Sequence, residues 1–277
     1  MFYPTGLAQR RELGFAAQNF STVEINGTFY SLQRPKSFTE WASETPEDFV
    51  FSVKGSRFIT HMLKLREVKI PLANFFGSGV LRLGAKLGPM LWQFAPQMRF
   101  EPARFEEFFR LLPRSHREAA KLMRGYADRM REDADFRVKR DFPIRHCMEI
   151  RHESFVVPEF VEMLRKHDIG LVVADTVEWP LLMDVSSDFV YCRLHGSEQL
   201  YASGYDGPAL DVWADRAITW ARGGQPQGRR ADQVDAKVRP RDVYIYFDND
   251  AKVRAPFDAK GLEERVKRMG SECRTSV

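Results

Sequence analysis

The chain alternates short apolar runs with amphipathic stretches along nearly its whole length. The runs are rich in β-branched and aromatic residues, which is typical of β-strands. Most are apolar at odd and even positions alike in their first half, as are the strands of a parallel sheet that is buried on both faces. We therefore predict seven strands. They cover residues 22–26, 49–54, 89–94, 147–151, 170–175, 189–195 and 243–249.

Helix signals lie between these predicted strands. Proline is favoured in the first turn of a helix, and glycine just past its end, so both residues mark helix boundaries here. A Ser or Thr followed three residues later by Glu predicts a capping box. The signals are Ser37 with Glu40, Pro102, Pro158, Pro208 with Gly223-Gly224 at the end of its helix, and Asp258 before the last helical stretch.

Alternation of strands and helices predicts right-handed βαβ units. We expect an α/β fold, a TIM-barrel-like (β/α) barrel, although such a barrel closes with eight strands and only seven are visible. The alternative is an open doubly wound sheet. No glycine-rich nucleotide-binding motif follows any predicted strand, so nucleotide-binding forms of that sheet lack their signature.

The chain of 277 residues predicts a single domain over residues 1–277. Two segments within it have the character of insertions. Residues 115–142 predict a charged helical insertion with no strand partner, and residues 223–240, rich in glycine, proline and charge, predict a flexible surface loop.

Composition limits the class of protein. Charged residues make up 29% of the chain, no apolar run approaches the roughly 20 residues of a membrane span, and the amino terminus has no apolar signal-peptide core. The three cysteines are widely spaced and odd in number, which excludes a disulfide framework and a CxxC zinc site. We expect a soluble cytoplasmic protein with no membrane partner.

The net charge of +4 is concentrated in one segment. Residues 104–145 hold 12 Lys and Arg against 8 Asp and Glu, so this stretch alone carries an excess of four positive charges. A basic stretch can attract nucleic-acid phosphates. Its charges also alternate in sign at helical spacing, as they do on an ordinary exposed helix, and no aromatic ladder accompanies them.

Polar side chains interrupt the predicted strands in a regular way. Successive side chains of a strand alternate between its faces, so Glu24 shares a face with Asn26, as do Glu149 with Arg151 and Arg193 with His195. Other polar residues stand at or just past the carboxyl ends of strands, namely Lys54, Gln93, Asp175 and Asn249. In a (β/α) barrel those ends form the mouth that supplies catalytic groups. We expect the acids and cations to converge there and to pair, because isolated buried charges are costly.

Eight segments carry a family resemblance. They are VEINGTFY (23–30), W…TPEDFVFSVK (41–54), ITH (59–61), LGPMLWQFAP (87–96), MEIRHESF (148–155), VVAD (172–175), FVYCRLHG (189–196) and YFDNDAKVRAPFDA (246–259). Together, from about Phe2 to Met269, they resemble the YecE-like family, also called domain of unknown function 72. The resemblance implies a TIM-barrel-like fold and no established reaction. The characteristic polar positions of that family correspond here to Glu24, Asn26, Lys54, His61, Gln93, Glu149, Arg151, Asp175, Arg193, His195 and Asn249.

The sequence departs from the family pattern at its start. Family members begin with a glycine-rich strand before the FYP segment, whereas this chain begins at Met1-Phe2-Tyr3-Pro4. Our hypothesis is that the true start lies upstream, which the intact mass of the native protein tests. Without that strand, the sheet would expose two unpaired edges.

The mixed acid and base set predicts an enzyme, or a ligand-binding protein, that acts on a small anionic or polyhydroxylated substrate at the barrel mouth. We expect the arginines to clamp an anionic group, a glutamate to act as general base, the histidine as general acid, and the lysine to stabilise developing negative charge. The expected catalytic residues are Glu24, Lys54, Glu149 and His195. The expected substrate-binding residues are Asn26, His61, Gln93, Arg151, Arg193 and Asn249.

Two further hypotheses accompany this one. Glu149, Asp175 and His195 form an oxygen and nitrogen set that suits a divalent metal such as Mg, Mn or Zn. The alternative function is a non-catalytic nucleic-acid- or protein-binding module that uses the basic stretch at 104–145. A purely structural role for the polar cluster remains the third hypothesis, in which Arg193→Met would destabilise the protein without affecting any ligand.

Overall fold

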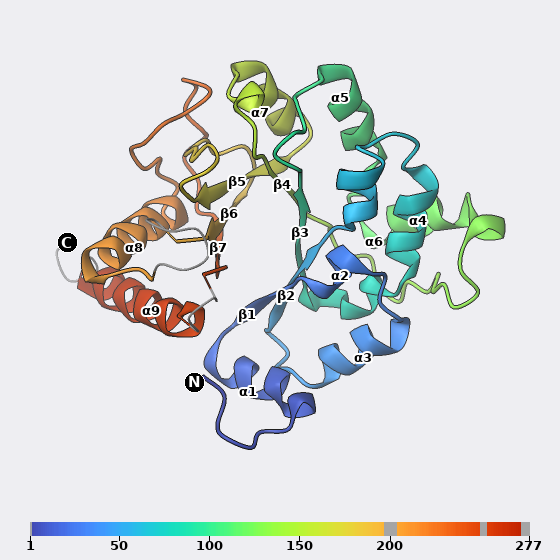
Figure 1. The fold of residues 1–277 in the computed structure, drawn as a ribbon, viewed down its shortest axis with the longest axis horizontal. Coiled ribbons are helices and arrows are strands. Elements are labelled where there is room, and N and C mark those ends of the chain that lie inside the picture. Colours follow the sequence, from blue (N-terminus) through green and yellow to red (C-terminus); the bar gives the residue numbers. More distant parts are fainter. Residues whose placement is uncertain (1, 197–203, 250–253, 273–277) are drawn as a thin grey trace. The chain divides into compact units, whose positions relative to one another are not determined.

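The structure is a computed structural model that describes residues 2–196, 204–249 and 254–272 (Figure 1). The chain divides into two compact units. The first contains Tyr3–Met148, and the second contains Glu149–Val277 together with Met1–Phe2. Among the described residues, no helix is both long and apolar enough to cross a lipid bilayer.

Within the described residues, seven strands form one sheet in the order β1-β2-β3-β4-β5-β6-β7. The pairs β1–β2, β2–β3, β5–β6 and β6–β7 are parallel. All seven predicted strand segments are confirmed. The strands are β1 (Thr22–Ile25), β2 (Val50–Lys54), β3 (Leu87–Gln93), β4 (His146–Glu149), β5 (Ile169–Asp175), β6 (Phe189–Leu194) and β7 (Asp242–Phe247). Strands β5 and β6 are buried along almost their whole length, whereas every residue of β1 is only half-buried.

Helices separate most of the strands, as the alternating pattern predicts, but the described chain has no helix between β5 and β6 (Figure 1). The α-helices of the described chain are α1 (Glu12–Asn19), α2 (Gly27–Tyr30), α3 (Pro35–Ser43), α4 (Lys69–Gly77), α5 (Pro102–Leu111), α6 (His116–Arg124), α7 (Pro158–Lys166), α8 (Gly207–Ala221) and α9 (Ala255–Glu272). Shorter turns of 3-10 helix cover Gln9–Arg11, Val80–Lys86, Ala127–Arg129 and Glu153–Phe155, and a π-helical turn covers Phe58–Met62.

The proline signals are confirmed. Pro102 and Pro158 are the first residues of α5 and α7, and Pro208 lies in the first turn of α8, where the side chain of Asp206 accepts a hydrogen bond from the Ala209 amide at 2.8 Å. Gly223 follows the end of α8 with a φ of 91°, a conformation that glycine adopts without strain.

Two helix-start predictions are wrong. Helix α3 begins at Pro35, so Ser37 already lies inside its first turn and forms no capping box with Glu40. The fixed φ of proline starts the helix two residues earlier. Helix α9 begins at Ala255, so Asp258 lies within the helix rather than before it.

The segment 115–142 is helical only in part. Helix α6 packs against α4 and buries His116, Ala119, Ala120 and Met123, so this part of the segment belongs to the packed unit. From Met130 to Phe142 the chain has no helix, and it is anchored by the Asp135 amide, which donates to the Gly77 carbonyl at 2.9 Å. The segment is therefore one packed helix followed by a docked irregular strap.

Residues 223–240 contain no helix or strand, as expected of a loop. This loop is nevertheless held by buried carboxylates. Asp184 accepts from the amides of Ala231 and Asp232 at 2.8 and 3.0 Å, and Asp232 itself is buried and pairs with Arg165. Because these groups bond to backbone and to each other, the middle of the loop is tied to the unit.

Candidate functional site

A charged cluster joins the ends of β4, β6 and β7 within the unit that begins at Glu149. Arg193 donates from Nη1 to Glu149 at 2.7 Å and from Nη2 to Asp248 at 2.8 Å. Arg151 forms a second, two-bond pair with the other Glu149 oxygen, at 2.8 and 2.7 Å. His195 Nδ1 lies 3.2 Å from the Asp248 oxygen that Arg193 contacts. The cluster thus contains two carboxylates, two guanidinium groups and an imidazole.

Strand register explains why these side chains meet. In the parallel pair β6–β7, Arg193 is opposite Tyr246 and Leu194 is opposite Phe247. The ladder continues past the strand ends, where the Asp248 amide donates to the Leu194 carbonyl at 2.8 Å. His195 and Asp248 are therefore neighbours, and alternation puts both on the sheet face of Arg193.

Burial within this cluster is uneven. The side chains of Glu149 and Arg193 are 0% and 1% exposed, whereas that of Asp248 is 35% exposed. Buried ions are costly unless opposite charges and hydrogen bonds compensate them, and here two acids face two arginines. Guanidinium N–H groups contact both oxygens of Glu149. Asp248 is consequently the carboxylate of the cluster that is open to solvent.

Trp179 covers one side of the cluster. Its ring lies 4.0 Å from the Arg151 guanidinium carbon, which is a cation–π contact, and its centroid is 5.8 Å from the His195 ring in an edge-to-face arrangement. Trp179 is itself buried and stands four residues beyond the carboxyl end of β5. The tryptophan therefore fixes the orientation of both an arginine and the histidine.

Asp175 does not join this cluster. It is paired in the β5–β6 register with Leu194, not with Arg193, so its side chain takes the opposite face of the sheet. There its Oδ2 accepts from the Tyr205 hydroxyl at 2.9 Å and from Trp213 Nε1 of α8 at 3.3 Å. The prediction that Asp175 converges with the other polar residues is wrong for this reason.

Asn249 likewise belongs to the opposite side, one position beyond Asp248. It is fully buried, and its Nδ2 donates to Asp258 of α9 at 2.8 Å. The same Asp258 oxygen accepts from the Tyr205 amide at 3.1 Å. Asp258 thus ties the end of β7 to helix α9, which gives Asn249 a positioning role in the fold.

The suggested metal set is not assembled. Within the described ranges, no group of three or more His, Cys, Asp or Glu side chains is arranged to hold a metal ion. Glu149 is engaged by two arginine cations, and Asp175 lies on the other face of the sheet from His195. Glu149, Asp175 and His195 therefore do not fit a divalent metal as they stand.

A second set of predicted residues lies in the unit of residues 3–148. The registers Glu24–Ser52 and Lys54–Leu91 place Glu24, Lys54 and Gln93 on one face of strands β1 to β3. Glu24 is half-buried, whereas Lys54 and Gln93 are buried at their strand ends. The registers therefore bring together Glu24 and two of the residues that the sequence predicts at strand ends.

An aromatic ring organises the neighbourhood of Lys54. Its Nζ lies 4.5 Å from the centroid of the Phe29 ring, and the His61 ring packs edge-on against Phe29 at 5.2 Å. His61 lies in the π-helical turn, where its Nδ1 is 2.8 Å from the Thr60 hydroxyl. Asn26 is exposed and immediately precedes α2. Lys54 and His61 therefore both contact the Phe29 ring.

Sequence reasoning missed Asp248 and Trp179. Asp248 stands at a strand end just as Asn249 does, but only the β6–β7 register shows which of the two shares a face with Arg193. Trp179 carried a usable signal, because it lies in the segment that follows a predicted strand, where TIM-barrel sites recruit residues. Both residues stand where the sequence predicts the mouth of the barrel, but the sequence alone does not distinguish them from the neighbouring positions.

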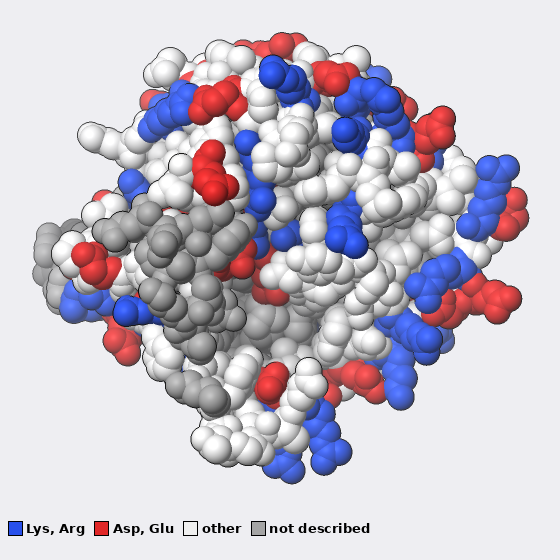
Figure 2. Space-filling view, in the orientation of Figure 1, with Lys and Arg blue, Asp and Glu red and all other residues white. Residues whose placement is uncertain are grey.

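Several arginines of the basic stretch have acidic partners. Figure 2 shows Lys and Arg interspersed with Asp and Glu over the face in view. Close acidic partners face many of these cations. The pairs are Arg104 with Glu101, Arg110 with Glu106, Arg117 with Asp141, Arg131 with Asp133 and Arg137 with Asp135. Such pairing weakens the local positive field that nucleic-acid binding needs.

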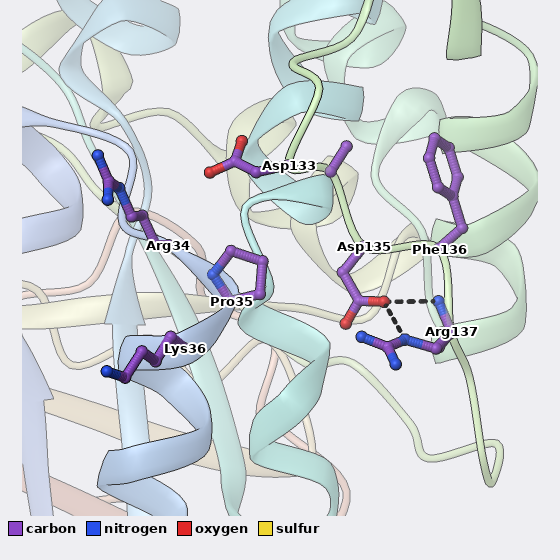
Figure 3. A pocket seen from close by; sticks show the side chains of 8 residues that line it. Arg34, Pro35, Lys36, Asp133, Asp135, Phe136 and Arg137 are labelled. Atoms are coloured by element: carbon purple, nitrogen blue, oxygen red, sulfur yellow. Dashed lines mark hydrogen bonds and ion pairs between the residues drawn. The ribbon is translucent and has the colours of Figure 1, made fainter.

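The docked strap borders a hollow of about 740 Å³ (Figure 3). Arg34, Pro35 and Lys36 line one side, and residues 133–137 line the other. Asp135, which is buried, accepts from the amide and Nε of Arg137 at 3.2 and 2.9 Å and also pairs with Arg82. Cations and acids thus alternate around this hollow, and its best-buried acid serves to hold the strap.

The strand order and the cluster at the strand ends define a TIM-barrel-like α/β protein. The chain belongs to the family described as protein of unknown function DUF72, whose model matches residues 1–276 and so spans both compact units. This confirms the resemblance to the YecE-like family.

Solved structures of that family share the fold. A DUF72 family protein from Thermotoga maritima MSB8 superposes with a TM-score of 0.69 at 22% identity, over 96% of this chain and 92% of that one. A DUF72 family protein from Enterococcus faecalis V583 gives a TM-score of 0.66 at 16% identity, over 92% and 93% of the two chains.

Curated relatives match over shorter stretches. UPF0759 protein YecE of Escherichia coli K12 is 34% identical over 92 residues, which is 28% of this chain and 34% of that protein. UPF0759 protein YunF of Bacillus subtilis 168 is 34% identical over 58 residues, or 21% of each. The matches therefore span about a third or less of each curated relative.

Proposed function

We propose that the protein binds a small polyhydroxylated molecule at the ends of β4, β6 and β7 and acts on it there. The observation that carries this proposal is the unequal exposure of the charged cluster. Glu149 is buried between Arg151 and Arg193, while Asp248, held by Arg193, is 35% exposed. A partly exposed carboxylate whose position is fixed by an arginine suits hydroxyl donors.

The arrangement gives Glu149 and Asp248 roles that differ from those predicted from the sequence. Glu149 serves to hold Arg193 and Arg151, because guanidinium groups engage both of its oxygens. Asp248 takes the role of proton acceptor toward a ligand hydroxyl. His195 Nδ1 lies 3.2 Å from the same carboxylate, next to its negative charge. Arg193 is the positioning residue, since it fixes both carboxylates.

A negatively charged ligand group is disfavoured next to Asp248. Two acids and two arginines cancel within the cluster, so no guanidinium is left over to clamp an anionic group there. A neutral hydroxyl group carries no net charge, so it needs no free guanidinium and is not repelled by the Asp248 carboxylate. The polyhydroxylated class is therefore the better match to this end of the site.

The test is a thermal-shift and calorimetric titration with sorbitol, glucose, ribose and myo-inositol. A ligand present at about 100 times its Kd stabilises a protein by about 2.7 kcal/mol. We expect at least one of these polyols to bind the wild type. Asp248→Asn should then raise its Kd about tenfold or more, since the amide is a weaker acceptor than a carboxylate.

Asp211→Asn is the matched control. Asp211 is a half-exposed acid on α8 that pairs with Arg265, outside the cluster. This variant should bind as the wild type does. Failure of all four polyols to bind, or an equal loss in both variants, would overturn the proposal.

A further inference from the structure

A second hollow, of about 430 Å³, lies in the same unit as the charged cluster. Trp179 is common to both, because it lines the hollow and also packs on Arg151 and His195. The volume falls within the range of small-molecule pockets, which runs from about 300 to 1,000 Å³. Trp179 thus links the two places, and the hollow is large enough to hold one chemical group of a small ligand.

Two arginines line this hollow, and their surroundings differ. Arg229 forms a two-bond pair with Glu153, at 3.1 and 2.7 Å. Arg216 of α8 is half-buried, and its guanidinium lies 4.7 Å from the Trp213 ring. In the part of the chain that the structure describes, Arg216 has no carboxylate within ion-pair distance. Its positive charge is therefore available to an outside group.

Trp179 provides an independent sign of a missing acceptor. The residue is 8% exposed, and its Nε1–H has no hydrogen-bond partner among the described residues. A buried N–H left unpaired costs free energy, so native structures nearly always satisfy such groups with protein or water. An acceptor oxygen entering from the hollow would remove this cost.

We infer that this hollow is a subsite for an anionic oxygen group, a carboxylate or a phosphate, of the same ligand. The inference rests on the proposed function, because Asp248 holds the hydroxylated part. Arg216 supplies the charge and a planar pair of donors, and Trp179 Nε1 supplies a directed one. The ligand of the whole site is then a hydroxylated acid, with its hydroxyl groups at Asp248 and its anionic end at Arg216.

Glu178 lines this hollow, and its negative charge repels an anion there. It is exposed, so solvent and salt screen its charge, whereas the half-buried Arg216 is screened less. Glu153 is neutralised by Arg229. The remaining field at Arg216 therefore favours an anionic group.

The experiment compares matched acid and neutral probes by calorimetric titration of the full chain. The carboxylate pairs are gluconate with sorbitol and glucuronate with glucose, and the phosphate pair is glucose 6-phosphate with glucose. We expect one acid to bind about tenfold or more tightly than its neutral counterpart, and the pair that shows this preference identifies the anionic group. Arg216→Gln should abolish the preference. Trp179→Phe, which keeps an aromatic ring and removes the N–H, should reduce it several-fold.

Arg222→Gln is the control, because Arg222 is an exposed arginine at the end of the same helix and does not line the hollow. It should retain the full preference for the acid. Equal binding of every acid and its neutral partner, or a preference that survives in Arg216→Gln, overturns the anion subsite. Asp248→Asn separates the two proposals, since it should weaken acid and neutral probes alike. If no probe of either kind binds, the proposed function fails and this subsite with it.

Discussion

Arg193 of β6 and Glu149 of β4 form a buried ion pair, with Nη1 and Oε2 separated by 2.7 Å and neither side chain more than 1% exposed. The two residues are 44 positions apart in the chain. Removing one partner of such a pair leaves the other charge buried and uncompensated, which costs more than the pair itself contributes. This asymmetry makes the pair a sensitive test of the cluster.

Arg193→Met should lower the free energy of unfolding by about 3–5 kcal/mol, because Glu149 and Asp248 both lose their shared cation. Urea denaturation followed by circular dichroism measures this change. Lys267→Met is the control, since it removes only an exposed pair with Glu263 and should cost about 1 kcal/mol or less. A loss in Arg193→Met no larger than that of the control would show that the cluster is not coupled as described.

His146 should make the protein acid-sensitive. Its Nδ1 accepts from Trp92 Nε1 at 3.1 Å, and its Nε2 is 2.8 Å from the Pro113 carbonyl, so the neutral ring with a proton on Nε2 satisfies both contacts. Burial, and secondarily the charge of Arg114, lower the pKa of His146 from 6.5 to about 3. The unfolded chain therefore binds a proton between those values that the folded chain does not.

Because the folded-state pKa is depressed, the stability that His146 contributes is present above about pH 6.5 and is lost as the pH falls toward 3. The loss at pH 4 should be about 3 kcal/mol relative to pH 7. His146→Gln, which cannot protonate, should be less stable at pH 7 but should show a flatter dependence over this interval. Urea midpoints measured from pH 4 to pH 7 test this, and parallel curves for both proteins would contradict it.

Gly55 should not tolerate a side chain. Its amide donates to the Leu91 carbonyl at 2.7 Å, and a Cβ added there would lie 2.3 Å from Cε3 of the buried Trp92 ring. Gly55→Ala should therefore destabilise the protein by about 1–3 kcal/mol through overpacking. Gly14→Ala in α1 has open space around it and should instead stabilise by about 0.5–1 kcal/mol. Thermal unfolding of the two variants should give shifts of opposite sign.

Tyr205 should anchor the far side of the sheet. Its hydroxyl donates to Asp175 at 2.9 Å and accepts from the Gly196 amide at 3.2 Å. Tyr205→Phe should cost about 1–3 kcal/mol, since it leaves buried polar groups without this partner. Polyol binding at Asp248 should persist, because Tyr205 bonds to the other face. Loss of binding in a folded Tyr205→Phe variant would contradict the assignment of Asp175 to that face.

Tyr205 should also make the protein sensitive to alkali. Burial, and then the negative charge of Asp175, raise the pKa of Tyr205 above its usual value of 10. The stability it contributes is therefore complete below about pH 10 and is lost as the pH rises above that value. The free energy of unfolding should fall more between pH 9 and pH 11 for the wild type than for Tyr205→Phe.

Much of the site could be anticipated from alternation along single strands. Arg193 and His195, two residues apart, share a face in any extended strand, and Glu149 ends its own strand with Arg151 two positions on. These inferences held because they depend only on local backbone geometry.

Asp175 and Asn249 mark where this reasoning stops. Each occupies a strand end, yet both side chains take the face opposite Arg193. The relative shift of two neighbouring strands by one residue exchanges the faces of all side chains on one of them. No feature within β5 or β7 alone reveals that shift.

The sequence by itself determined the seven strands, the helices α5, α7 and α8, whose starts prolines mark, and the class of fold, because hydrophobic periodicity and proline and glycine positions act locally. Only the tertiary structure decided that Asp248, rather than Asn249, joins Arg193 and His195, and that Trp179 covers Arg151. Both features depend on strand register and on packing between segments that are far apart in the chain. The energy of such a contact depends on both residues of the pair, so neither residue alone predicts it.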